Sequence, residues 1–372
     1  IISAAPTISA AVTSPAVMAL PISIDARRIV SLIADELSRY GRTKHVWAAR
    51  VDSELGRPGI ASNEPPAAVP AITEYLEEAE TNHDYLVVET DPDRTRWTQR
   101  GVTMGDRVLV VMSASPSADE IRRTEAIFTA GPRRARVERW LALLQPAGVE
   151  CPTGTAALAD RLGVDRVVHL REGRDSDLRR VARLVSGNAT GLVLGGGGAR
   201  GFGHLGVARA LEELGVVVDV IAGASIGAPL GAGLAMLVSP NDMVALARRL
   251  FHDLLDYTVP VVSLIKGERV TRSISRQFGD LDIRDLWLPF LCVSTNLTRS
   301  RVEIHDRGAV TTAVRASVAI PGILPPVPFE GDLLVDGGVL NNLPCDVLQG
   351  TRMVNRLIAV DLSPHVGPRA EG

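Results

Sequence analysis

The segment GASIG at residues 223–227 fits the pattern G-x-S-x-G, in which the serine is a nucleophile. An apolar run at 216–221 precedes it, and an Ala- and Gly-rich segment at 229–237 follows it. This order of strand, turn and helix is the context that the pattern requires. We therefore expect Ser225 to project from a sharp turn at a helix N-terminus, where the helix dipole favours developing negative charge. The small residues that such a turn needs are Gly223, Gly227 and Ala228.

A run of glycines at 195–198 lies about 27 residues before this serine and follows the apolar residues 192–194. A serine that attacks an ester carbonyl creates an oxyanion, which backbone N–H groups can stabilise. Glycines offer such groups with no Cβ to obstruct the substrate. The sequence therefore predicts an oxyanion loop, in which Arg200 either stiffens the loop, counters a lipid phosphate or pairs at the surface. The residues assigned to this loop are Gly196, Gly197, Gly198, Arg200 and Gly201.

The same glycines also match the dinucleotide-binding fingerprint G-x-G-x-x-G. That reading needs an acidic residue about 20 residues later, at the end of a second strand. Asp219 is the available match, and it would make the chain an oxidoreductase with a cofactor bound at 195–201. The G-x-S-x-G pattern that follows favours the hydrolase over this alternative.

Asp336, in the segment VDGGV, is the candidate base that accepts the serine proton. An aspartate is a weak base, so it must contact Oγ directly in a poorly solvated site. Gly337 and Gly338 would allow the loop to approach the serine closely. The competing arrangement is a triad of Ser225, Asp336 and His365, although His365 lies in a polar tail rich in Pro and Gly. Two further histidines are His204, interpreted as packed or loop-supporting, and His305, interpreted as surface on a strand edge.

Taken together, GGGGARG, GASIG and DGG resemble the motifs of patatin-like phospholipases, in the same order. RASVAIPGILPPV (315–327) and DGGVLNNLP (336–344) extend the resemblance, and DYTVPVVSLIKGERV (256–270) is similar to bacterial relatives of neuropathy target esterase. The resemblance covers residues 190–365 and implies a Ser–Asp dyad without histidine. On this basis Ser225 is the nucleophile and Asp336 the base.

The resemblance also implies the substrate, an acyl ester of a lysophospholipid or phospholipid, cleaved through an acyl-serine intermediate. No metal site or oxygen-rich calcium loop is visible, so we expect hydrolysis without metal or other cofactor. The apolar segment 251–265 suits either buried packing, a cover for the acyl chain or contact with a bilayer. We expect a cytoplasmic protein, with peripheral contact at the inner membrane face as its only membrane association.

The elements before these motifs alternate between strands and helices, which favours a parallel α/β sheet. Expected strands lie at 17–22, 45–51, 85–89, 107–112, 137–144 and 166–170. Expected helices lie at 25–40, 68–80, 117–130, 155–162 and 175–185, with a loop at 56–70. A boundary is expected at Gly187–Asn188. The predicted organisation is therefore a linker at 1–16, a smaller α/β domain at 17–186, and a patatin-like α/β domain at 187–372.

Residues 84–115 resemble the second half of partition-type P-loop ATPases, in which an acidic residue at a strand end helps to hold magnesium. No G-x-x-x-x-G-K-[ST] precedes them, so a phosphate-binding loop is missing and we expect a degenerate, regulatory or scaffold domain. This part is also similar to the segment that follows cyclic-nucleotide-binding modules in neuropathy-target-esterase-like proteins, and such modules, if this protein has them, would lie before Ile1. An alternative function is a nucleotide-responsive regulatory protein with a vestigial or inhibited hydrolase domain.

The overall composition excludes some partners. The formal net charge of the 372 residues is −3, which gives no general basic field for nucleic acid. The three cysteines, Cys151, Cys292 and Cys345, show no paired or metal-binding spacing. We therefore expect a protein of a reducing compartment that binds no nucleic acid.

Overall fold

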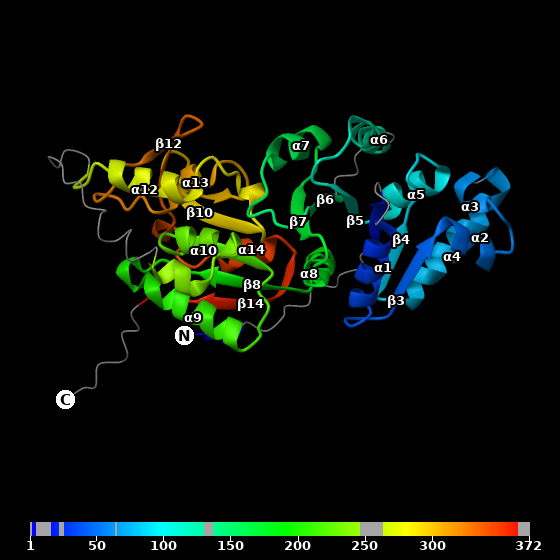
Figure 1. Ribbon diagram of the computed structural model, residues 1–372, viewed down its shortest axis with the longest axis horizontal. Helices are drawn as coiled ribbons and strands as arrows, with labels where there is room; N and C mark the ends of the chain where they lie inside the picture. The colour runs from blue at the N-terminus through cyan, green and yellow to red at the C-terminus, as the bar shows by residue number, and fades with distance from the viewer. Residues whose placement is uncertain are drawn as a thin grey trace. The chain divides into compact units, whose positions relative to one another are not determined.

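The computed structural model describes residues 2–4, 16–21, 26–63, 65–129, 137–245 and 263–363 (Figure 1). The chain divides into two compact units. The first comprises residues 8–188, and the second comprises residues 189–372 together with residues 1–7. The division between the units comes just after Gly187. This glycine caps the C-terminus of a helix and has a φ of +76°, in the left-handed region.

The first unit is built on a six-stranded sheet in the order β3-β4-β2-β5-β6-β7, in which every pair is parallel. Its strands confirm the alternating pattern read from the sequence and shift its boundaries by a few residues at most. The strands are β2 (Ala16–Pro21), β3 (Thr43–Trp47), β4 (Tyr85–Glu89), β5 (Arg107–Ser113), β6 (Glu138–Gln145) and β7 (Arg166–Arg171).

Helices cover both faces of this sheet, as parallel strands require. On one face α1 (Ala26–Leu37) packs against α8 (Asp175–Ser186), where Glu36 pairs with Arg183 at 3.4 Å. On the other face the buried side chains of four helices form one core with Val108, Val110 and Met112 of β5. These helices are α4 (Val69–Asn82), α5 (Arg96–Met104), α6 (Ala118–Thr129) and α7 (Thr155–Leu162).

Two expectations for this unit were wrong. The strand expected at 45–51 ends at Trp47, and α2 (Ala48–Glu54) begins at once, because Ala48 and Val51 are both buried at helical spacing. The loop expected at 56–70 contains two short helices, α3 (Ile60–Asn63) and the 3-10 turn η1 (Pro66–Ala68). Asp52 organises this region, since its carboxylate accepts from the N–H groups of Gly59 and Ala61.

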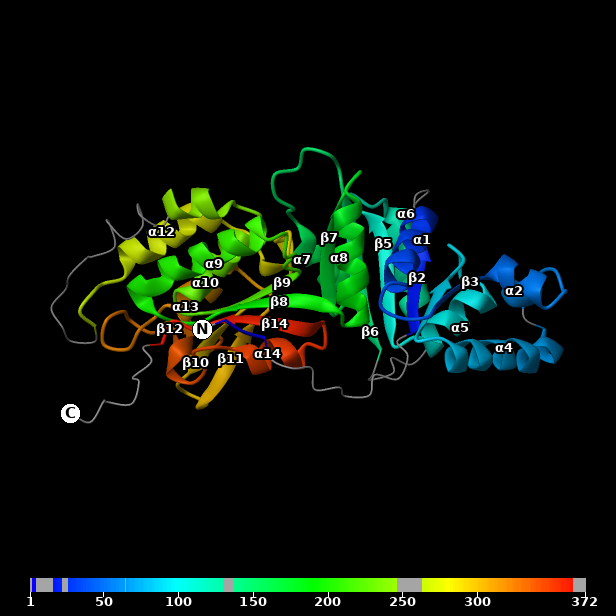
Figure 2. The same cartoon turned by 90° about the horizontal axis from the view of Figure 1, so that it is seen from below.

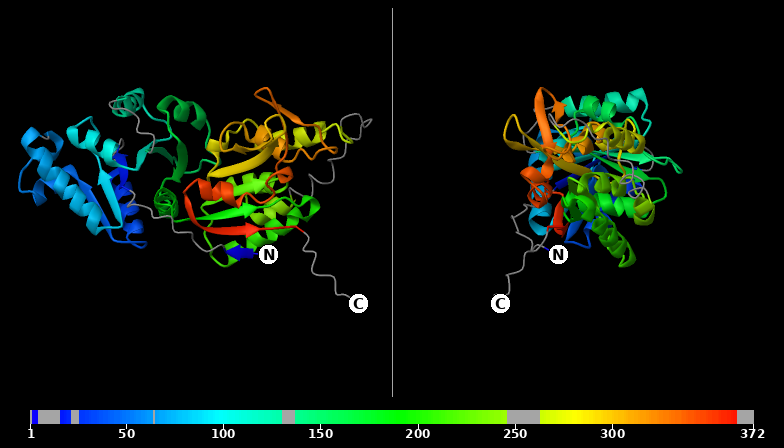
Figure 3. Two further views of the ribbon diagram at one scale, coloured as in Figure 1. Left: turned by 180° about the vertical axis from the view of Figure 1, so that it is seen from behind. Right: turned by 90° about the vertical axis from the view of Figure 1, so that its left-hand side faces the viewer.

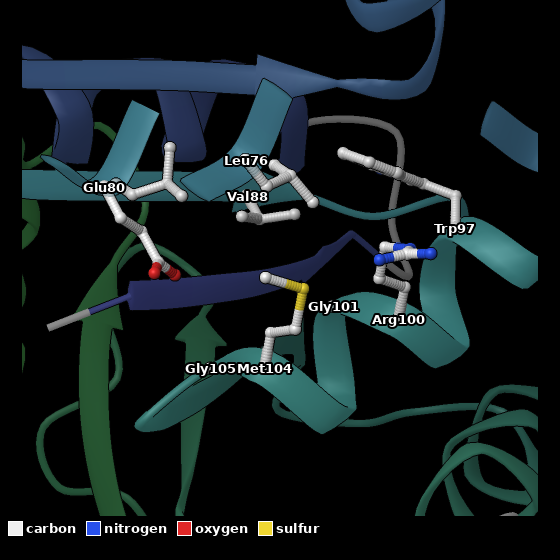
Figure 4. A pocket seen from close by; sticks show the side chains of 9 residues that line it. Leu76, Glu80, Val88, Trp97, Arg100, Gly101, Met104 and Gly105 are labelled. Carbon is white, nitrogen blue, oxygen red and sulfur yellow. The ribbon is translucent and has the colours of Figure 1, made fainter. Parts of the chain in front are cut away.

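The acidic residue at the end of β4, Glu89, is buried and engaged by basic side chains. It bonds to Arg27 Nε at 3.0 Å and to His45 Nε2 at 3.0 Å. A nearby cavity of about 10 Å³ opens between β4, α4 and α5 (Figure 4), enough for about one water molecule. Its walls include Glu80, Trp97 and Arg100. A cavity of this volume is too small for a nucleotide.

The second unit has an eight-stranded sheet in the order β1-β14-β8-β9-β10-β13-β12, with β11 also paired to β10. The four central strands, β14, β8, β9 and β10, are parallel, and the outer pairs are antiparallel. Figure 3 shows β8 and β14 side by side. The strands are β1 (Ile2–Ala4), β8 (Ala189–Leu194), β9 (Val220–Ala224), β10 (Phe290–Asn296), β11 (Arg301–His305), β12 (Val327–Phe329), β13 (Asp332–Asp336) and β14 (Val354–Val360).

Residues 2–4 depart from the linker expected at 1–16, because they pair as β1 with the edge of β14. The pairing satisfies backbone groups that an edge strand would otherwise leave open. Residues 5–15 of that linker lie outside the described residues. The strand expected at 216–221 is also displaced and runs from Val220 to Ala224, since the small residues Gly223 and Ala224 fit closely beneath the next helix.

Figure 2 shows α9 (Phe202–Glu213) and α10 (Gly227–Ala235) on one side of the central strands and α14 (Cys345–Gly350) on the other. Two further helices, α12 (Glu268–Phe278) and α13 (Val310–Ser317), pack against each other. Within the described part of the chain, no helix is both long and apolar enough to cross a bilayer. The loops after β8 and β9 lie at the carboxyl ends of parallel strands, where ligands usually bind in such folds.

Candidate active site

Ser225 lies in the turn between β9 and α10, with a φ of +51°. A serine in the left-handed region is strained by about 1–2 kcal/mol, and such strain is typical of functional turns. Two glycines make the turn possible. A Cβ on Gly223 would lie 2.6 Å from the carbonyl carbon of Gly227, and a Cβ on Gly227 would overlap the carbonyl oxygen of Leu194.

Gly227→Ala is expected to destabilise the second unit by about 1–3 kcal/mol, because the new methyl group meets the backbone of β8. The backbone at Ser225 should be displaced as well, since Gly227 belongs to the same turn. Gly206→Ala is the matched control, because a Cβ there meets nothing within 4 Å and α9 gains helix propensity. Thermal unfolding measures both variants. Equal midpoints for the two would contradict the close packing assigned to the turn.

Ser225 Oγ donates a hydrogen bond to Asp336 Oδ2 at 2.6 Å. Both side chains are buried, Ser225 at 7% exposure and Asp336 at 4%. Asp336 ends β13, where it is the cross-strand neighbour of Ser294 on β10. The N–H of Gly338 donates to the other carboxylate oxygen at 2.7 Å. The turn after Asp336 comes close to β10, since a Cβ on Gly337 would overlap the carbonyl oxygen of Val293.

Burial raises the pKa of Asp336 above its usual value, although the hydrogen bonds from Ser225 and Gly338 partly oppose the rise. A higher pKa makes the carboxylate a stronger base than an exposed aspartate. The arrangement can therefore take a proton from Ser225 without a histidine between them.

The glycine run connects β8 through the 3-10 turn η2 (Gly198–Gly201) to α9. The first hydrogen bond of this turn runs from the N–H of Arg200 to the carbonyl of Gly197, so the N–H groups of 197–199 precede it. Gly198 has a φ of +55° and open space where a Cβ would be. These are the backbone donors of the loop that remain for an oxyanion among the described residues.

Three other members of the loop have packing contacts. The N–H of Gly196 donates to the carbonyl of Asn342 at 3.0 Å, so we assign the oxyanion donors of the loop to residues 197–199. A Cβ on Gly196 would lie only 3.1 Å from Cβ of Ser225, and one on Gly201 would overlap Ile226. The exposed Arg200 donates from Nε to the carbonyl of Gly197 at 3.3 Å, which favours its loop-stiffening interpretation.

Ser317, which the sequence analysis did not single out, holds the backbone of the turn. Its buried Oγ accepts from the N–H of Ser225 at 3.0 Å and donates to the carbonyl of Val293 at 2.7 Å. Ser317 lies within RASVAIPGILPPV, a motif that the sequence analysis did recognise. The motif alone does not show that Ser317 bonds to the backbone of Ser225. Asn342, in DGGVLNNLP, was missed for the same reason.

Ser317→Ala is expected to cost about 1–3 kcal/mol, because it leaves the N–H of Ser225 and the carbonyl of Val293 without this partner in a buried site. Ser263→Ala is the control, since that buried hydroxyl makes one bond, to the carbonyl of Ile265, and its loss should cost about 1 kcal/mol. Chemical denaturation compares the two. A smaller loss at Ser317 than at Ser263 would argue against the bridging role.

His204 and His305, the two candidate histidines that the structure describes, form hydrogen bonds with partners other than Ser225 and Asp336. His204 is fully buried and donates from Nε2 to the carbonyl of Gly195 at 2.7 Å, in agreement with a loop-supporting residue. His305 is 4% exposed and bonds to Ser294 Oγ at 2.8 Å, so its assignment to the surface was wrong. It lies on β11, which pairs with β10, and its ring makes an edge-on contact with the ring of Phe329. His365 lies outside the described residues, as do residues 251–262 of the apolar segment.

The dinucleotide alternative does not fit the position of Asp219. Asp219 directly precedes β9, is fully buried, and accepts from the N–H of Thr190 at 3.0 Å. It therefore lies at the amino end of the strand, opposite the end that carries the glycine loop. Among the described residues, no group of three or more His, Cys, Asp or Glu is placed to hold a metal ion.

Comparison with known proteins adds independent information. Residues 192–348 match the model of the family described as patatin-like phospholipase. The chain is 34% identical over 320 residues to patatin-like phospholipase domain-containing protein 6 of Mus musculus, covering 77% of this chain and 24% of that protein. It is 44% identical over 181 residues to lysophospholipase nte1 of Aspergillus fumigatus, covering 47% of this chain and 12% of that protein.

The chain spans about a third or less of the length of the curated relatives it matches. A solved ParA family ATPase from Chlorobium tepidum is 13% identical, covers 47% of this chain and 91% of its own, and has a TM-score of 0.32. That likeness is too low to carry an argument, so the P-loop-like character of the first unit stays a prediction. The family match and the relatives agree with the motifs of the second unit: residues 192–348 of this chain form a patatin-like phospholipase domain.

Proposed function

We propose that this chain is a serine hydrolase that cleaves acyl esters of lysophospholipids or phospholipids with Ser225 and Asp336. The hydrogen bond of 2.6 Å between Ser225 Oγ and Asp336 Oδ2 carries the proposal. It joins a strained serine at a helix N-terminus to a buried carboxylate of raised pKa. Nucleophilic catalysis by a serine needs a base in direct contact with the attacking oxygen, and this hydrogen bond supplies that contact.

In the proposed mechanism Ser225 Oγ attacks the ester carbonyl while Asp336 takes the hydroxyl proton. The carbonyl oxygen becomes an oxyanion, which the N–H groups of residues 197–199 and the dipole of α10 stabilise. The tetrahedral intermediate collapses, Asp336 returns the proton to the leaving alcohol, and an acyl-serine remains. Asp336 then accepts a proton from water, which attacks the acyl-serine, and gives that proton to Ser225 Oγ as the C–Oγ bond breaks and the fatty acid leaves.

Apolar side chains near the dyad support a substrate with an acyl chain. Ile320 and Ile323 follow Ala319, whose carbonyl accepts from the N–H of Asp336 at 2.9 Å. Val339 and Leu340 follow the glycines next to Asp336. These four side chains are 37–52% exposed. A lipid tail or the surface of a bilayer would cover them, so we include peripheral membrane contact in the proposal.

The test is release of fatty acid from lysophosphatidylcholine and of p-nitrophenol from p-nitrophenyl esters, with a chelator present. We expect both activities, together with loss of activity when a fluorophosphonate labels the protein. Peptide mapping should place the label on Ser225. Folded protein that hydrolyses neither substrate and takes up no label would overturn the proposal.

A further inference from the structure

Resting on the proposed function, we infer that Asn342 is a positioning residue that couples the loop of the base to the oxyanion loop. Asn342 lies six residues after Asp336, in the segment that follows β13. Its partner is Gly196, which immediately precedes the residues whose N–H groups we assign as oxyanion donors. One residue thus connects the two loops that must act on the same tetrahedral intermediate.

The connection is a two-point contact between Asn342 and the backbone of Gly196. The carbonyl of Asn342 accepts from the N–H of Gly196 at 3.0 Å, and its side-chain Nδ2 donates to the carbonyl of Gly196 at 3.3 Å. The preceding residue, Gly195, is also held at both backbone groups. Its N–H donates to the carbonyl of Val360, and its own carbonyl accepts from His204 Nε2. The peptide that leads into the donors at 197–199 therefore has a set position.

The side chain also fills the space between the two loops. A Cβ on Gly196 would overlap Asn342 Oδ1, and a Cβ on Gly338 would lie 2.7 Å from the same atom. Gly338 is the residue whose N–H bonds the carboxylate of Asp336. A displacement of Asn342 would therefore shift both the loop that carries Asp336 and the loop that carries the oxyanion donors.

The amide is the side chain that suits this position. Its NH₂ group donates towards the carbonyl of Gly196, whereas a carboxylate of the same shape would repel that carbonyl. A carboxylate would also bring a second negative charge near Asp336 and the developing oxyanion. Asn341→Asp is a control for charge and composition, because Asn341 Nδ2 bonds to the exposed Asp346 instead of the glycine loop.

The experiment measures kcat and KM for p-nitrophenyl ester hydrolysis by wild type, Asn342→Ala, Asn342→Asp and Asn341→Asp. For Asn342→Asp we expect kcat to fall by about 10²-fold with KM nearly unchanged, because misplaced donors act on the transition state alone. Asn342→Ala should lose less, and Asn341→Asp should retain wild-type kinetics. The acid limb of the pH profile should move to higher pH in Asn342→Asp only, since the new charge disfavours ionisation of Asp336.

A second readout separates positioning from folding. A trifluoromethyl ketone forms a tetrahedral adduct with an active-site serine, so its inhibition constant reports on oxyanion stabilisation. We expect this constant to rise in parallel with the loss of kcat in both Asn342 variants. A merely structural role would reduce the fraction of active molecules and leave the constant unchanged, which would overturn the inference. Asn342 variants with wild-type kcat would overturn it too, whereas an inactive wild type would overturn the proposed function and the inference together.

Discussion

Ser225→Ala is expected to lower the turnover of acyl esters by about 10⁴- to 10⁶-fold. Without Oγ there is no atom to form the acyl intermediate, and the hydrogen bond to Asp336 Oδ2 is lost. The residual rate would come from the oxyanion donors and substrate binding alone. Initial rates of fatty-acid release from lysophosphatidylcholine measure the effect.

Ser225→Gly is the companion variant, since it removes the same oxygen and relieves the backbone. At a φ of +51° glycine avoids a steric cost that both serine and alanine bear. We expect Ser225→Gly to unfold at a higher temperature than Ser225→Ala, with both variants equally inactive. Substantial hydrolysis by either variant would assign the nucleophile to another residue and remove the basis of the proposed mechanism.

Asp336→Asn is expected to lower kcat by about 10²- to 10⁴-fold, because an amide cannot accept the proton of Ser225. The geometry should survive, since Asn can still accept from the N–H of Gly338 and contact Ser225 Oγ. Stopped assays of p-nitrophenyl ester hydrolysis measure the loss. Histidine variants provide the control: His365→Ala should retain activity, and dependence on His365 would restore the triad that the motif order also allows.

The pH dependence follows from the raised pKa of Asp336, which burial causes. The base acts when ionised, so kcat/KM should fall with decreasing pH around a pKa higher than that of an ordinary aspartate. A raised pKa means that the folded state binds the proton more tightly, so this contribution to stability is present at low pH and is lost as pH rises through the folded pKa. Asp336→Asn should therefore be at least as stable as wild type at neutral pH, with the advantage shrinking towards low pH. A destabilised variant at neutral pH would contradict this sign.

The elements of the first unit could be read from the sequence where periodicity is strong and connections are short. The strand at 85–89 and the helix at 155–162 were predicted with the bounds that they have in the structure. The short helix α2 was not, because its seven residues directly follow a strand and offer too few positions for a helical period. β1 lies beyond local reasoning altogether, since its three residues become a strand only by pairing with β14.

The residue types of the candidate site follow from local sequence. Each motif indicates a requirement of the backbone. G-x-S-x-G indicates a tight turn, the glycine run indicates a loop without Cβ atoms, and D-G-G indicates a close approach of two segments. The tertiary structure alone determines which backbone N–H groups of those motifs are already hydrogen-bonded within the protein. The N–H of Gly196 is taken by Asn342, 146 residues away, and the N–H of Ser225 is held by Ser317, 92 residues away. A hydrogen-bond partner so distant leaves no trace in the spacing of a motif, because only folding brings the two segments within 3 Å of each other.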